Sequence, residues 1–305
     1  MKSIFRNKCL CCNSTNLDEI INLGNHSFAD RFIPKSKVFF KDPVYPLILD
    51  LCSKCNFIQS RAITNPKKRY VDFNYSYTSD NSNYSRNHWN KFASDLDKQF
   101  NFKNKKIIEI GSNDGFLSNI LKKKGANILA VDASNLMVKI CRKKKIKSIQ
   151  SIFTNSESKK IKKIYGVADF IIANNVFNHS NNPNDFLKGV KNLLKDDGKF
   201  IFEQPNFTKG VISLKFDQIY HEHISYFTAK NIKSILNYNN FKIMDISNND
   251  YHGGSLRTVA IIKRSKEKVP KENKINLRKY VSYEVKNKIY KIKNYRDMMI
   301  EINKK

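Results

Sequence analysis

The sequence lacks any apolar run that approaches the roughly 20 residues needed to cross a membrane. It also shows no signal peptide, because charged residues lead to Cys9 without an apolar segment between them. We therefore expect a cytoplasmic protein with no membrane partner, whose cysteines are metal ligands or free thiols rather than disulfides. The 305 residues, 40% of them hydrophobic, indicate two domains or one large domain with an appendage. We find no internal repeat.

Acidic residues are scarce, since 27 Asp and Glu stand against 56 Lys and Arg for a net charge of +29. Lysine far outnumbers arginine and is spread along the chain, whereas nucleic-acid sites gather basic residues on one face, often with stacking aromatics. The Lys clusters at 122–124, 142–145 and 159–163 fall on expected helices or their ends, where they would be solvated. Nucleic acid is therefore not the favoured partner, although this charge would attract anionic substrates.

The loop after the first expected strand lacks the GxGxxG pattern of a dinucleotide site. It reads EIGSNDG, and Asp132 ends the next expected strand 17 residues after Gly115, where a carboxylate can accept hydrogen bonds from ribose hydroxyls. An acidic loop suits a ligand with a cationic centre, such as S-adenosylmethionine, better than a phosphate. We therefore expect a cofactor site made of Glu109, Gly111, Ser112, Asn113, Asp114, Gly115, Asp132 and Asn174.

Five of the six cysteines lie within the first 55 residues. Two CxxC knuckles, Cys9 with Cys12 and Cys52 with Cys55, are separated by 39 residues and predict one tetrahedral zinc site. Four thiolates leave no open position for water, so this zinc is expected to be structural. The insert between the knuckles must carry its own strands or turns. Cys141 is expected to be a core thiol.

Alternating strands and helices, closed by two consecutive strands, predict a doubly wound α/β sheet with an antiparallel edge. The expected strands are 107–110, 128–132, 168–173, 200–203, 241–246 and 255–263, and the expected helices are 116–124, 184–194 and 229–237. We divide the chain into a zinc-binding module (1–70), an α/β domain (71–265) and a Lys-rich helical tail (266–305) without further core. Residues 71–90 read as a connecting segment that leads into a helix.

Three polar clusters are candidates for chemistry. Tyr220-His221-Glu222-His223 follows the strand 200–203, where it can supply a general base, an orienting acid and a phenol donor. His221 and His223 could instead be metal ligands on one face of a strand, or ordinary surface residues. The second cluster is Asn174 and Asn175 with His179, which could also be a loop that caps the next helix. The third is Tyr75, Tyr77 and His88, which could simply pack the connecting segment.

These elements resemble, in order, the sugar C-methyltransferases. The resemblance rests on the four-cysteine module, EIGSNDGFL, NNVFNHSNNPNDF, FDQIYHEHISYFT and HGGSLR, and extends from Cys9 to Val259. It implies a class I methyltransferase with a Rossmann-like sheet, S-adenosylmethionine as cofactor and a nucleotide-linked keto-deoxysugar as substrate. It also implies that His223 removes a proton next to the ketone and that the enolate takes the methyl group. Around the substrate it places Tyr220, Glu222, His179 and either Tyr75 or Tyr77, with His221 as a further candidate.

The sequence departs from this family after HGGSLR, where members usually continue into a second Rossmann-like domain. Here a Lys-rich tail ends at Lys305, which we interpret as a remnant of that domain. The protein would then be a shortened relative or would bind a different carrier. Two alternatives stay open: an RNA methyltransferase that holds RNA with its zinc module, and a non-catalytic, degenerate family member.

Overall fold

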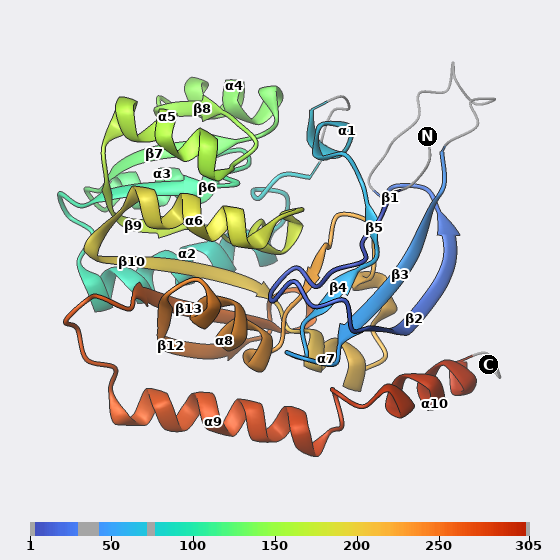
Figure 1. The fold of residues 1–305 in the computed structure, drawn as a ribbon. Helices are drawn as coiled ribbons and strands as arrows, with labels where there is room; N and C mark the ends of the chain where they lie inside the picture. Colours follow the sequence, from blue (N-terminus) through green and yellow to red (C-terminus); the bar gives the residue numbers. More distant parts are fainter. Residues whose placement is uncertain (1–3, 30–42, 72–76, 303–305) are drawn as a thin grey trace.

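The computed structural model describes residues 4–29, 43–71 and 77–302, and its centre is a seven-stranded sheet with helices on both faces (Figure 1). The strand order is β12-β13-β10-β9-β6-β7-β8. The five strands from β10 to β8 are parallel, and β13 runs antiparallel to both of its neighbours. The doubly wound α/β prediction is confirmed, with the antiparallel strand one position in from the edge. The strands are β6 (Lys106–Ile110), β7 (Asn127–Asp132), β8 (Ser148–Gln150), β9 (Ala168–Ile172), β10 (Leu194–Pro205), β12 (Phe241–Asn249) and β13 (Ser255–Ile262).

Two apolar cores cover the two faces of this sheet, because neighbouring residues of a strand point to opposite sides. Ile107 packs into the core shared with α2 and α3, whereas Ile108 packs into the core shared with α5, α6 and α8. Cys141 of α4 is fully buried in the first core, as predicted. The helices are α2 (Asn83–Phe100), α3 (Phe116–Lys123), α4 (Asn135–Lys143), α5 (Asn155–Tyr165), α6 (Pro183–Leu193), α7 (Phe207–Ile212) and α8 (Ala229–Tyr238).

Short polar side chains set where most of these helices begin. Ser82, Ser134, Thr154, Asn182 and Thr228 each accept a hydrogen bond from a backbone N–H in the first turn of the helix that follows. Such caps satisfy donors that the helix itself leaves unpaired. The helix starts therefore follow from local chemistry, and the buried faces then fix the helices to the sheet.

A second, antiparallel sheet with the order β11-β4-β3-β2 forms the amino-terminal part of the molecule. Its long strands β2 and β3 lie between the two cysteine knuckles, which confirms that the insert carries strands of its own. The last strand, β11, comes from the α/β part of the chain and pairs with β4. The strands are β2 (Leu17–His26), β3 (Tyr45–Cys52), β4 (Ile58–Ser60) and β11 (Ser225–Tyr226), and a separate pair joins β1 (Ile4–Phe5) to β5 (Ala62–Ile63).

The expectation that the tail has no further core is wrong. Its helices α9 (Lys271–Lys286) and α10 (Ile292–Ile302) run along the molecule beside β12 and β2 (Figure 1). Ile289 and Tyr295 are 0% exposed and belong to a core shared with β2, β3 and β4. The sequence pattern missed this because the buried apolar residues of the tail are few and begin at the turn between the helices.

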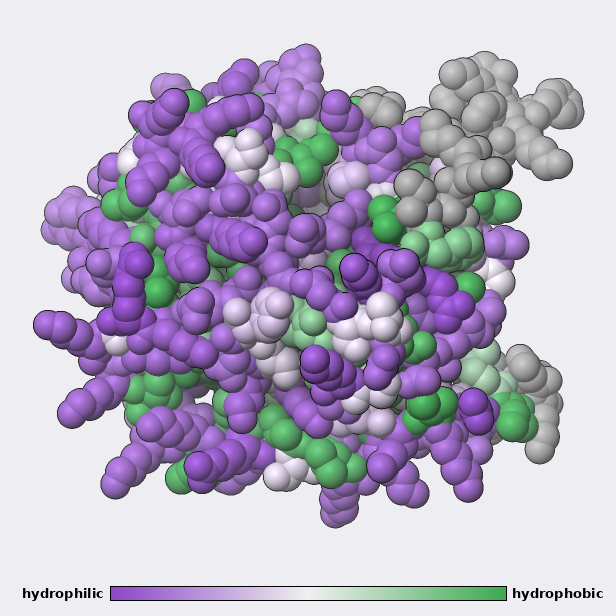
Figure 2. All heavy atoms as spheres, viewed as in Figure 1, coloured by the Kyte–Doolittle hydropathy of each residue, from purple (hydrophilic) through white to green (hydrophobic). Residues whose placement is uncertain are grey.

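The visible surface is mostly hydrophilic, with apolar side chains in small separate groups (Figure 2). Within the described residues, no helix is both long enough and apolar enough to cross a membrane.

Candidate functional site

A cavity of about 670 Å³ lies at the carboxyl ends of the parallel strands. Its wall includes residues that follow β6, β7, β9 and β10. The neighbouring strands β6 and β9 connect to opposite sides of the sheet, since β6 leads to β7 and β9 leads to β10. Open α/β sheets bind ligands at such a switch point, and small-molecule sites have volumes of about 300–1,000 Å³. Position and size therefore make this cavity the candidate active site.

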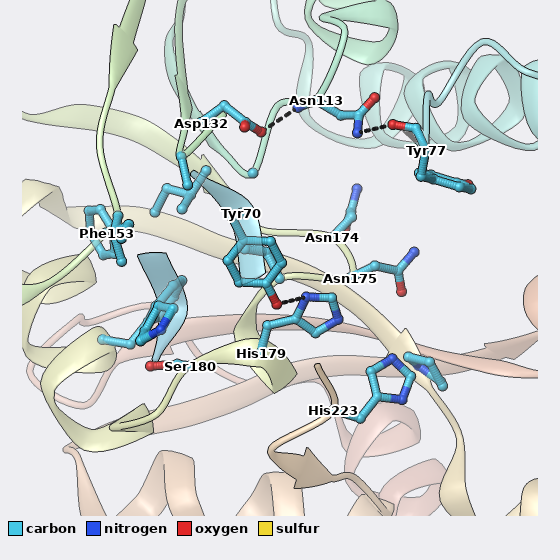
Figure 3. A pocket seen from close by; sticks show the side chains of 18 of the residues that line it. Tyr70, Tyr77, Asn113, Asp132, Phe153, Asn174, Asn175, His179, Ser180 and His223 are labelled. Carbon is cyan, nitrogen blue, oxygen red and sulfur yellow. Dashed lines mark hydrogen bonds between the residues drawn. The ribbon is translucent and has the colours of Figure 1, made fainter. Parts of the chain in front are cut away.

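One end of the cavity is built around Asp132 (Figure 3). Its Oδ2 accepts the backbone N–H of Asn113 and its Oδ1 accepts that of Ser134, both at 2.8 Å. Each carboxylate oxygen keeps a lone pair, so the side chain can still accept hydroxyl groups from a ligand. Burial raises the pKa of Asp132 above its ordinary value. The two backbone donors hold the carboxylate in place for a ribose-type contact.

Only some residues of the EIGSNDG loop line the cavity. Gly111 and Asn113 line the cavity, together with Asn174 at the end of β9. Gly111 has φ +71°, and a Cβ there would lie 2.8 Å from Cβ of Val176. A glycine is therefore required where this loop crosses the segment after β9.

Four predicted cofactor residues, Glu109, Ser112, Asp114 and Gly115, do not line the cavity. Glu109 is buried behind the loop and accepts the Ser118 hydroxyl, and burial raises its pKa to about 8. Asp114 accepts the backbone N–H of Phe116 at the start of α3. The structure thus gives these four residues positions that support the loop rather than contact a ligand in the cavity.

The four predicted zinc ligands come together near the amino terminus. The Sγ atoms of Cys9, Cys12, Cys52 and Cys55 all lie within 4.8 Å of one another. Cys9 and Cys55 are 3.5 Å apart, and Cys12 and Cys52 are 3.8 Å apart. A tetrahedron with Zn–S bonds of about 2.3 Å has edges of about 3.8 Å, so this donor set fits zinc. Among the described residues, no other group of three or more His, Cys, Asp or Glu side chains is placed to hold a metal.

The opposite end of the cavity is formed by His223, with its ring 4.2 Å from that of Tyr220 and 5.2 Å from that of His179. Its Nδ1 lies 2.8 Å from the carbonyl oxygen of Gln218. A carbonyl only accepts, so Nδ1 carries the hydrogen and Nε2 keeps a lone pair. Burial lowers the pKa of His223 to about 4, which keeps the ring neutral at pH 7. His223 is thus fixed in a tautomer that can accept a proton at Nε2.

His179 lines the same cavity from the segment after β9 (Figure 3). Its Nδ1 lies 3.0 Å from the Tyr70 hydroxyl and 4.0 Å from Oε2 of Glu222. Its Nε2 is buried and has no hydrogen-bond partner among the described residues, and the same holds for both side-chain polar atoms of Asn174. Burial, with His223 and Arg69 nearby, lowers the pKa of His179 well below its ordinary value. Buried polar atoms are normally satisfied, so these unpaired groups indicate a polar ligand.

Tyr70 is a residue of this site that the sequence analysis missed. It ends α1 (Pro66–Tyr70), and its hydroxyl accepts a hydrogen bond from Arg69 at 3.2 Å. Arg69 also donates to the backbone oxygens of His179 and Glu222. Tyr70 and His179 are 109 positions apart, and no local pattern marks a tyrosine at the end of a short basic helix. Only the folded chain brings this tyrosine to the cavity.

The two histidines of the YHEH element face different surroundings. His221 does not line the cavity. Its Nε2 lies 3.0 Å from the backbone carbonyl oxygen of Tyr45, and its ring packs against the rings of Phe28 and Tyr45. Residues 220–222 form a bend and a turn, and none of residues 220–224 lies in a strand, so alternation does not put His221 and His223 on one face. The structure therefore gives His221 a packing position, and His223 is the histidine of this element that lines the cavity.

The third polar cluster is divided. Tyr77 lines the cavity, and its hydroxyl lies 3.3 Å from that of Tyr251. Tyr75 falls outside the described residues. His88 does not line the cavity, stacks on Tyr251, and has its Nε2 2.6 Å from Oε1 of the buried Glu203. Of this cluster, Tyr77 is the residue that the structure brings to the site.

Comparison with known proteins matches residues 84–246, more than half of the chain, to a family described as methyltransferase domain. The chain belongs to this methyltransferase family. Residues 9–70 match a putative zinc binding domain. C-methyltransferase NovU from Streptomyces niveus is 22% identical over 259 residues, which cover 84% of this chain and 61% of NovU. The chain thus spans about three fifths of the length of that relative.

A solved structure shares the fold of this methyltransferase. The PH0226 protein from Pyrococcus horikoshii OT3 has a TM-score of 0.50 and 19% identity, over 65% of this chain and all of that protein. Magnesium protoporphyrin IX methyltransferase from Synechocystis PCC 6803, with bound SAH, has a TM-score of 0.47 and 18% identity, over 59% of this chain and 84% of that one.

Two cofactors belong to this methyltransferase. The family and the class I fold identify S-adenosylmethionine as the methyl donor. The matched zinc-binding region and the four-cysteine cluster identify zinc as the second. The Asp132 carboxylate and the unpaired Asn174 amide suit the hydroxyl and amino groups of the donor.

Proposed function

We propose that this protein is a C-methyltransferase that methylates the carbon next to the ketone of a nucleotide-linked keto-deoxysugar. The observation that carries this proposal is one cavity with a cofactor-type wall around Asp132 and a neutral His223 at the other end. The similarity to NovU, itself described as a C-methyltransferase, supports carbon as the acceptor atom.

S-adenosylmethionine, when bound, would supply an electrophilic methyl group. Gly111, Asn113, Asp132 and Asn174 are the residues that would hold it, because they line the cavity at the ends of β6, β7 and β9. In this proposal, the proton transfer takes place at the opposite end of the cavity, where His223 and His179 lie.

His223 would act as the general base. A C–H bond next to a ketone is acidic because the charge that remains spreads to the ketone oxygen. Nε2 of His223 can take this proton, since its Nδ1–H is already held by Gln218. A pKa of about 4 makes the free imidazole a weak base, but its protonated form would be stabilised by the adjacent enolate.

Tyr220 or His179 would donate a hydrogen bond to the enolate oxygen. Both side chains line the cavity beside His223. His179 can donate through Nε2 when its Nδ1 accepts the Tyr70 hydroxyl. Glu222, whose Oε2 lies 4.0 Å from Nδ1 of His179, would orient that ring in the other tautomer, in which Nδ1 carries the hydrogen and Tyr220 is the donor to the enolate.

Hydrogen exchange on the substrate tests this function directly. The protein with a keto-sugar nucleotide in deuterated water should exchange the hydrogen next to the ketone without any methyl donor. His223→Ala should lose exchange and methyl transfer while binding S-adenosylmethionine normally in calorimetry. His26→Ala, at an exposed histidine of β2, is the matched control and should keep all three properties. Full exchange by His223→Ala, or no exchange by the unaltered protein with keto-sugar nucleotides, would contradict the proposal.

A further inference from the structure

One lysine stands out in the wall of the cavity. Among the described residues that line it, Lys215 is the only Lys or Arg. Its side chain is half-buried, and its Nζ lies 3.5 Å from the carbonyl oxygen of Gly253. No carboxylate of the described residues lies within 4.0 Å of this ammonium group, although the exposed Asp217 lines the same cavity. A cation without an acidic partner at a ligand cavity calls for an anion on the ligand.

The turn at Gly253 and Gly254 is shaped to let this lysine lie across it. The two glycines have φ values of +75° and +127°, which residues with a side chain rarely adopt. A Cβ on Gly253 would lie 2.0 Å from Nζ of Lys215, and one on Gly254 would lie 2.3 Å from Cδ of Lys209. The ammonium of Lys209 is 3.1 Å from the exposed Asp250, so of the two lysines only Lys215 lacks an acid. The glycine turn thus leaves room for an unpaired cation at the cavity.

This lysine is connected to the proposed base through Gln218. The Gln218 carbonyl accepts Nδ1–H of His223, and its side-chain amide donates to the carbonyl of His252, which precedes Gly253. Gln218, His252 and Gly253 all line the cavity with Lys215. A ligand whose ring lies at His223 would therefore have Lys215 on the same wall, connected to His223 through three hydrogen bonds.

We propose that Lys215, lying over the Gly253–Gly254 turn, binds the phosphoryl anion of the substrate. This inference rests on the proposed function for the sugar, because a nucleotide-linked sugar carries its diphosphate on the ring that bears the ketone. The charge of a lysine ammonium and its three donors suit phosphate oxygens. The net charge of +29 would bring such an anion to the cavity in the first place.

Calorimetry on the protein saturated with S-adenosylhomocysteine tests the site with two probes, inorganic pyrophosphate and thymidine diphosphate. Lys215→Gln should weaken binding of both by about 10- to 100-fold, the effect of losing a charge-assisted hydrogen bond. Lys215→Arg, which keeps the charge, should stay within about fivefold of the unaltered protein. Lys209→Gln removes a neighbouring charge and is the matched control; it should change binding by less than about twofold. Binding of S-adenosylhomocysteine itself should be the same in all four proteins.

The outcomes separate this inference from the proposed function. Equal losses in Lys215→Gln and Lys209→Gln would show a general charge effect and overturn the Lys215 site, as would a lack of binding by the unaltered protein. Selective loss in Lys215→Gln supports the site even if no keto-sugar nucleotide undergoes exchange, in which case the proposed function alone would fail. Exchange and methyl transfer with an unchanged KM in Lys215→Gln would leave the function standing and overturn the phosphoryl site.

Discussion

Replacement of Glu284 by alanine should destabilise the whole α/β core, although this residue lies in the Lys-rich tail. Glu284 belongs to α9, is 2% exposed and reaches the start of α8. Its carboxylate accepts the backbone N–H groups of Ala229 at 2.5 Å and Lys230 at 3.1 Å, and the hydroxyl of Tyr290 at 2.5 Å. These are the first two backbone donors of α8, and the cap Thr228 accepts the third, from Asn231. One tail carboxylate thus completes the cap of a core helix.

The size of the effect follows from the donors left behind. A buried donor without a partner costs about 1–3 kcal/mol, so two of them cost about 2–6 kcal/mol. Burial raises the pKa of Glu284, which means that desolvation of its charge already offsets part of the gain. We therefore expect Glu284→Ala to lower the free energy of unfolding by about 3 kcal/mol. For a chain of 305 residues this corresponds to a drop in Tm of about 5 °C.

Thermal unfolding followed by circular dichroism would measure this drop. Glu284→Gln keeps one acceptor oxygen and should lose about half as much as Glu284→Ala. Glu272→Ala changes an exposed acid of the same helix and should shift the free energy by no more than about 0.5 kcal/mol. If Glu284→Ala has the same Tm as Glu272→Ala, α9 does not stabilise the start of α8, and the role assigned to the Glu284 carboxylate is wrong.

The zinc site, the cofactor site and the buried histidines each predict a measurable change. Elemental analysis should find one zinc per chain, and Cys52→Ser should lose it together with thermal stability; metal-free protein with unchanged melting would contradict a structural zinc. Asp132→Ala should weaken S-adenosylmethionine binding by about 1–3 kcal/mol in calorimetry. An unchanged affinity would show that this carboxylate does not contact the ligand. The pKa of His223 is lowered to about 4, so between the unfolded value near 6.5 and pH 4 the unfolded chain binds more protons and stability falls as pH falls. From pH 7.5 to pH 5, His223→Gln should therefore lose about 2 kcal/mol less than the unaltered protein in urea unfolding; equal losses would refute the shift.

The central sheet could be predicted because its strands carry dense apolar runs. Both faces of a parallel strand are buried, so segments such as 107–110 and 168–173 stand out against a Lys-rich background. The weak elements were missed for the converse reason. β8 has three half-buried or exposed residues, and β11 has two residues that join a sheet far away in sequence. Strands this short have no apolar periodicity from which a sequence analysis could predict them.

The site was predictable where backbone chemistry decides it and not where distant contacts do. Gly111 and Asp132 could be placed because a strand end, a glycine turn and a second strand end are local features. Spacing alone could not distinguish His221 from His223, because turn residues do not alternate between two faces, and only the family resemblance singled out His223. It also gave no sign of Tyr70, whose contact with His179 exists only after the amino-terminal sheet docks on the α/β domain.

That docking explains how a structural zinc can matter for chemistry it does not touch. The second knuckle leads directly into β4, which pairs with β11 just after the YHEH element. The backbone N–H of Ser60 donates to the carbonyl of Ile224, next to His223. Nine residues further on, the Arg69 guanidinium donates to the carbonyls of His179 and Glu222. Four thiolates leave the metal no open coordination position, so its influence on the reaction must pass through this backbone. Pro66 and Tyr70 of the amino-terminal module line the cavity, so this module forms part of the wall of the proposed active site, and we expect loss of zinc to displace that part of the wall.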